Sequence, residues 1–115
     1  MRHALPDPIL GKILSIIVPR MEAEGHTDYS LILFGSYAKG THKPTSDIDI
    51  AIKSQRPLGW ATWAKIEGDL EDTEIAQTFD IIEYASTSQN FQALIDREGV
   101  EIYRCEAGPG DNPAA

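Results

Sequence analysis

The stretch from residue 31 to residue 52 constrains the fold of this chain more than any other part of its sequence. An apolar run at positions 31–34 ends at Gly35, which is the pattern of a buried strand. Gly35 and Ser36 then open a short segment that Gly40 closes. We predict a strand-to-helix turn here, because glycine lets an anion approach the backbone while the serine hydroxyl and the first helical amides donate to phosphate oxygens.

A second strand is predicted from Asp47 onward, after a turn at residues 44–46. Along this strand Asp47, Asp49 and Ala51 alternate with three isoleucines, so the two carboxylates point to the same face. Their spacing along the strand is about 6.5 Å, and such a pair can hold divalent cations that bridge nucleotide phosphates. The alternatives are a solvated strand face, or Asp47 serving as a turn acceptor after Ser46.

Gly35-Ser36, ten intervening residues and Asp47-x-Asp49 together resemble the signature of the DNA polymerase β-type nucleotidyltransferases. More closely, the chain resembles the minimal nucleotidyltransferases, the MNT partners of two-gene HEPN/MNT pairs, over roughly residues 5–104. The resemblance implies an α/β (α+β) fold in which a small mixed sheet is flanked by helices. It also implies an enzyme that uses ATP as its substrate and Mg²⁺ as its cofactor.

A third carboxylate is expected on a neighbouring strand, because two metal ions need more than two ligands and the attacking hydroxyl needs a proton acceptor. We predict Asp80, at the position where the resembled family keeps its third aspartate. Its rival Glu83 points to the opposite face by strand parity. The expected reaction is in-line attack of a hydroxyl on the α-phosphate of ATP, with two Mg²⁺ ions held by Asp47, Asp49 and Asp80.

Four further residues are predicted to bind the nucleotide: Gly35, Ser36, Lys39 and Lys43. Ser36 would contact the β- or γ-phosphate, and its alternative role is that of a simple helix cap. Each lysine could pair with the triphosphate or remain solvated. Tyr37 could stack on a base or pack in the core.

Helices are predicted over residues 6–24, over 58–72 and from Thr87 or Ser88 to about 97, and further strands over 29–34, 78–85 and 100–103. In the first helix Asp7 is the expected N-cap, and Pro19 predicts a kink or a break. Trp60 and Trp63 are expected to pack in the core, with a partner-binding patch as the alternative. We expect one nucleotidyltransferase domain over 1–105 and a disordered tail over 106–115.

The chain is acidic, with a formal charge of −8 from 18 acidic and 10 basic residues. This argues against direct binding of nucleic acid, which depends on Lys and Arg to neutralise phosphates. The sequence contains no stretch of about 20 apolar residues and no signal-peptide pattern, so we expect no membrane segment. Its lone cysteine, Cys105, cannot form an internal disulfide, and we expect a cytoplasmic protein.

The resemblance implies a partner, a separately encoded helical HEPN toxin whose tyrosine receives AMP from the MNT chain, which thereby acts as the antitoxin. A domain of this size is not expected to position an acceptor by itself, so a partner or a second copy should do so. Two alternatives remain open. The chain could neutralise its partner by binding alone, or it could modify a small molecule such as an aminoglycoside together with a separate substrate-binding subunit.

Overall fold

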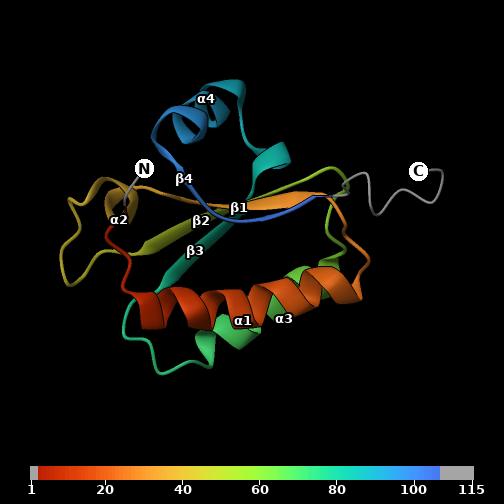
Figure 1. Cartoon of the computed structure of the whole chain (residues 1–115), viewed down its shortest axis with the longest axis horizontal. Helices are drawn as coiled ribbons and strands as arrows, with labels where there is room; N and C mark the ends of the chain where they lie inside the picture. The colour runs from red at the N-terminus through yellow and green to blue at the C-terminus, as the bar shows by residue number, and fades with distance from the viewer. Residues whose placement is uncertain (1–2, 107–115) are drawn as a thin grey trace.

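The computed structural model describes residues 3–106, which form a mixed four-stranded sheet with helices on both faces (Figure 1). The strands are β1 (Tyr29–Phe34), β2 (Ile48–Ser54), β3 (Phe79–Glu83) and β4 (Val100–Cys105). The helices are α1 (Asp7–Ala23), α2 (Ser36–Lys39), α3 (Trp60–Glu71) and α4 (Gln89–Glu98), with a 3-10 turn, η1, at Tyr84–Ser86. The sheet order is β3-β2-β1-β4, in which β1 is antiparallel to β2 and β4 while β2 is parallel to β3. This confirms the predicted fold class.

The two faces of the sheet carry different cores because side chains alternate along its strands. Figure 1 shows α1 and α3 side by side below the sheet and α4 above it. The larger core lies below the sheet and includes Ile13, Ile17, Met21, Leu31, Leu33, Ile48, Ile50, Ile52, Ile66 and Leu70. A smaller cluster of Phe34, Ala51 and Ile95 lies beneath α4. Each fully buried aliphatic side chain stabilises the fold by about 1.5–3 kcal/mol, so the three isoleucines of β2 fix which face its aspartates occupy.

The first helix differs from its prediction in two respects. It begins at Asp7 with Pro6 at the N-cap, so Asp7 lies in the first turn and the predicted cap is wrong. The helix also continues through Pro19, and the predicted break does not occur. Proline has no amide hydrogen, so the carbonyl of Ser15 has no partner within the helix. Both residues are exposed, so water can bond to this carbonyl.

The third helix treats its two tryptophans differently. Trp63 packs against the main core beside Ile66, as predicted. Trp60 is 85% exposed, so the prediction that it packs in the core is wrong. Trp60 is the first residue of α3 and lies off the stripe of Ile66 and Leu70 that faces the sheet.

The C-terminal half follows its predictions with shifted boundaries. Ser88 caps α4, since its hydroxyl accepts a hydrogen bond of 3.2 Å from the Phe91 amide. The third strand ends at Glu83, where the chain turns into η1, and β4 extends to Cys105. The predicted tail lies outside the described residues from position 107 onward. None of the helices within residues 3–106 has the length and hydropathy needed to cross a bilayer.

Candidate active site

Gly35 ends β1 in a backbone conformation that other residues avoid. Its φ of 74° and ψ of −153° fall in a region that is essentially restricted to glycine. A Cβ atom placed on Gly35 would also collide with the carboxylate of Asp49. The two residues meet because Phe34, immediately before Gly35, pairs with Asp49 in the β1–β2 ladder. The glycine therefore makes room for a neighbouring carboxylate, a role that the sequence pattern did not reveal.

The short helix α2 follows this glycine directly. Gly35 occupies its N-cap position, so the alternative role of Ser36 as a cap is wrong. The amides of Ala38 and Lys39 donate to the Gly35 carbonyl at 3.1 and 3.2 Å. Gly40 ends the helix in the left-handed region, with a φ of 79°. The half-buried Ser36 thus opens the helix, where the first amides have no partner within the helix itself.

The three predicted carboxylates belong to residues at the same end of the sheet. Asp49 lies in β2, and Asp80 is its direct neighbour in the parallel register of β3. Adjacent strands lie about 4.8 Å apart, so these two side chains leave the same face side by side. Asp47 lies one residue before β2 and is exposed. Glu83 is directed elsewhere, because its Oε2 accepts a bond of 3.0 Å from the Leu58 amide.

The electrostatics of this cluster are unfavourable without a counter-ion. Burial, followed by the charges of Asp80 and of Asp47 in that order, raises the pKa of Asp49 to about 6. Among the described residues, no Lys or Arg forms an ion pair with any of the three aspartates. A bound cation would relieve this repulsion and favour the ionised carboxylates.

Thr78 is a neighbour of the site that sequence reasoning missed. Its hydroxyl donates to Asp47 Oδ1, and its carbonyl accepts a bond of 2.9 Å from the Ile48 amide. Thr78 therefore ties the start of β3 to both the backbone and the carboxylate at the start of β2. The available signal was its parity with Asp80, two residues further on.

The remaining predicted residues are placed less directly. Lys39 Nζ lies 3.4 Å from Glu98 Oε1, an ion pair between α2 and α4. Lys43 is exposed in the loop before β2. Tyr37 is 3% exposed and stacks on His42 with ring centroids 4.3 Å apart, so it packs and does not offer an open platform for a base.

The three aspartates are ligands of the kind that a hard divalent cation takes, although their carboxylates do not point to a common centre. Among residues 3–106, no three His, Cys, Asp or Glu side chains are arranged to hold a metal ion. Asp47 and Asp80 are exposed, however, so their carboxylates have room to rotate toward Asp49, and Asp47 would give up its bond from Thr78 to do so. Carboxylate oxygens are the ligands that Mg²⁺ prefers.

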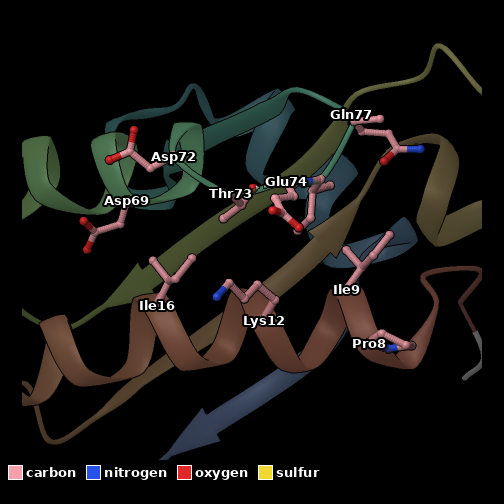
Figure 2. A pocket seen from close by; sticks show the side chains of 11 residues that line it. Pro8, Ile9, Lys12, Ile16, Asp69, Asp72, Thr73, Glu74 and Gln77 are labelled. Carbon is pink, nitrogen blue, oxygen red and sulfur yellow. Dashed lines mark hydrogen bonds between the residues drawn. The ribbon is translucent and has the colours of Figure 1, made fainter.

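A hollow of about 830 Å³ lies away from these residues. Figure 2 shows Ile9, Lys12 and Ile16 of α1 directed toward Thr73 and Glu74, in the segment between α3 and β3. None of the predicted site residues lines this hollow. The three aspartates lie instead at the starts of β2 and β3, outside this hollow.

Comparison with known sequences gives two matches that cover most of the chain. The family described as "Polymerase beta, Nucleotidyltransferase" matches residues 29–107. A Haemophilus influenzae protein named "Probable protein adenylyltransferase MntA" is 31% identical over 98 residues, which are 85% of this chain and 79% of that protein.

Solved structures share the fold at lower sequence identity. A chain of a toxin–antitoxin crystal structure with AMP-PNP matches with a TM-score of 0.60 and 23% identity, covering 77% of this chain and 71% of that one. A structure of tri-AMPylated Shewanella oneidensis HEPN toxin in complex with MNT antitoxin matches with a TM-score of 0.56 and 18% identity, over 82% and 71%. A putative nucleotidyltransferase from Sulfolobus solfataricus matches with a TM-score of 0.52 and 14% identity, over 84% and 81%.

Proposed function

Because this chain belongs to the polymerase β-type nucleotidyltransferase family, we propose that it transfers AMP from ATP to a hydroxyl of a partner protein and thereby acts as an antitoxin. The observation that carries the proposal is the pairing of Asp49 with Asp80 beside Gly35. That pairing places two carboxylates next to the turn at Gly35 and Ser36, whose backbone and hydroxyl are suited to bind phosphate. The adenylyltransferase name of the 31% identical relative supports AMP as the transferred group.

In the proposed reaction the acceptor oxygen attacks the α-phosphorus of ATP. The new bond joins that oxygen to phosphorus, the bond to the bridging α–β oxygen breaks, and pyrophosphate leaves. Asp80 takes the hydroxyl proton, and Ser36 with the first amides of α2 holds the β- or γ-phosphate. Mg²⁺, when bound by Asp47, Asp49 and Asp80, would neutralise the triphosphate and the developing charge. Lys39 and Lys43 are proposed as secondary phosphate contacts, and Lys39 would have to leave Glu98.

The proposed partner is a HEPN-type toxin, with a tyrosine as the acceptor. This is supported by the match to one chain of the complex of an AMPylated HEPN toxin with an MNT antitoxin. We place the reaction in the cytoplasm, where ATP is available and the lone Cys105 remains reduced.

The proposal is tested with labelled ATP, Mg²⁺ and the HEPN-type protein encoded beside this chain. We expect mass spectrometry to show the gain of one or more AMP units on the partner. Asp49→Asn should reduce the rate at least a hundredfold, whereas Asp72→Asn, an exposed aspartate next to α3, should leave it unchanged. Near-normal transfer by Asp49→Asn would contradict the proposed mechanism. Neutralisation of the partner without any mass gain would instead assign the chain as a binding-only antitoxin.

A further inference from the structure

The strand β3 is an open edge of the sheet. Among residues 3–106 it pairs only with β2. The Ile48 amide bonds to the Thr78 carbonyl, so the backbone groups of Thr78 and Asp80 face β2. By alternation, the amides and carbonyls of Phe79 and Ile81 face away from the sheet. Such an outward row of donors and acceptors is a template for another strand.

One face of α3 lies beside this edge and is not covered by the sheet. Two hollows of about 250 and 720 Å³ lie between α3 and β3, and Glu67 lines both. We call them together the β3 groove, which is lined by Trp60, Trp63, Ala64 and Glu67 of α3 and by Phe79 and Ile81 of β3. Trp60, 85% exposed, is an apolar anchor at its far end. The groove thus combines a strand edge with a partly apolar wall.

One end of the groove lies next to the aspartate cluster. Thr78 lines its near end and donates to Asp47, while β3 itself carries Asp80. Asp80 lies on the sheet face of Asp49, whereas Ile81 belongs to the opposite face, where it packs in the main core with Ile66. A strand added to β3 would alternate in the same way. One of its side chains could then stand beside Asp80 while both neighbours pointed toward α3.

We propose that the β3 groove receives an extended segment of the acceptor protein, which adds to β3 as a fifth strand and presents its hydroxyl beside Asp80. This rests on the proposed function and names how the acceptor is held. Exposed Glu67 and Glu71 line the groove in a chain of charge −8, so the segment should be basic. Apolar or basic side chains should flank the acceptor residue.

The opposite edge of the sheet is less suited to this role. On β4, Arg104 lies 2.8 Å from Glu101 and 3.0 Å from Glu106, so charged side chains line that strand. Its register with β1 also shifts between Leu31 and Ile32. Charges and irregular pairing are features that discourage the addition of a strand.

Two exposed alanines of α3 provide a matched test. Ala64 lines the β3 groove, whereas Ala61 does not. We expect Ala64→Arg to raise the KM for the HEPN-type partner at least tenfold, with kcat within twofold of wild type, because the new side chain fills and charges the groove. Ala61→Arg should behave as wild type. Both variants should keep the rise in melting temperature that MgATP causes, which shows an intact nucleotide site.

Amide exchange gives a direct readout of strand addition. On binding of the partner, exchange of the outward Phe79 and Ile81 amides should slow at least tenfold, while the inward Asp80 amide, already in the β2–β3 ladder, should change little. Protection that depends only on the concentration of this chain would assign the edge to a second copy and overturn the proposal.

The outcomes separate this inference from the proposed function. Equal KM values for Ala64→Arg and Ala61→Arg, with unchanged exchange at Ile81, would refute the groove while transfer itself stood. If the partner does not slow exchange of the Phe79 and Ile81 amides, the proposed strand addition is wrong. If the wild-type protein transfers no AMP, the proposed function fails. If the partner still protects the Ile81 amide in that case, the groove is a docking site without a role in transfer.

Discussion

Replacement of Gly35 by alanine should damage the site through one identifiable contact. The backbone at φ 74° and ψ −153° costs a non-glycine residue about 1–3 kcal/mol. The added Cβ collides with the Asp49 carboxylate, and because this is the end of a half-buried side chain that can shift, the collision costs about 1 kcal/mol, the low end of the range for overpacking. We expect a total loss of about 3 kcal/mol, which for a domain of this size lowers the melting temperature by about 15 °C.

Two other glycines are the controls. Gly40 has a φ of 79° but open space around its missing Cβ, so Gly40→Ala should cost only about 1–2 kcal/mol from backbone strain. Gly68 lies inside α3 with open space and no positive φ, so Gly68→Ala should stabilise the protein by about 0.5–1 kcal/mol. Calorimetry of the three variants should therefore rank Gly68→Ala above wild type, then Gly40→Ala, then Gly35→Ala.

A double-mutant cycle separates the collision from the strain. If the Asp49 carboxylate is the obstacle, Asp49→Ala should stabilise the Gly35→Ala background by at least about 1 kcal/mol more than it stabilises the wild type. The free energies of unfolding come from urea titration at pH 7.5. Additive effects of the two substitutions would refute the contact and leave backbone strain as the whole cause.

Three further predictions concern charge and ligands. Asp49→Asn should raise the free energy of unfolding at pH 7.5 by about 1 kcal/mol, after discounting the half-exposed carboxylate for solvent screening. Because the folded pKa of Asp49, about 6, lies above its unfolded value of about 3.9, its favourable contribution is present below pH 4 and lost as the pH rises through 6, so an equal gain at pH 3.5 would contradict this. Glu24→Ala should lower the free energy of unfolding by about 2–3 kcal/mol at pH 7. This carboxylate bonds the buried His26 Nε2 at 2.7 Å and accepts from the Gly59 amide and the Thr62 hydroxyl at the start of α3. The His26 contact lowers the pKa of Glu24, so the cost should shrink as the pH falls below about 4, whereas a similar cost for exposed Glu22→Ala would refute the network. MgATP should raise the melting temperature while ATP with EDTA does not, and an equal shift by both would argue against a metal-bridged site.

Much of the site could be read from local pattern. The apolar run ending at Gly35 and the alternation around Asp49 each describe a single element, and periodicity reports such elements directly. The pairing of Asp80 with Asp49 needed strand parity and the family resemblance, because the two residues are far apart in the chain. Their predicted catalytic and metal-binding roles, like the boundaries of the domain at 1–105, remain predictions.

Other features depend on contacts between distant segments. The pattern explained Gly35 by the approach of an anion, but the structure shows that the neighbouring strand brings Asp49 into the space of its missing Cβ. Glu24, which also bonds the nearby His26, joins the end of α1 to the start of α3 by accepting from the Gly59 amide, and no local signal marks that contact. Likewise, Trp60 is apolar and belongs to a helix, yet it is exposed because it lies off the stripe of α3 that packs on the sheet.

Local patterns predicted most of the elements and the face that each presents, since hydrophobic burial acts on a side chain according to its position in the local period. Which faces meet depends on how the elements pack together. The order β3-β2-β1-β4 puts Asp80 beside Asp49 and leaves β3 without an outer neighbour in the described chain. Strand order arises from the joint packing of all the elements in one core, and for that reason the open edge could not be inferred from any single stretch of residues.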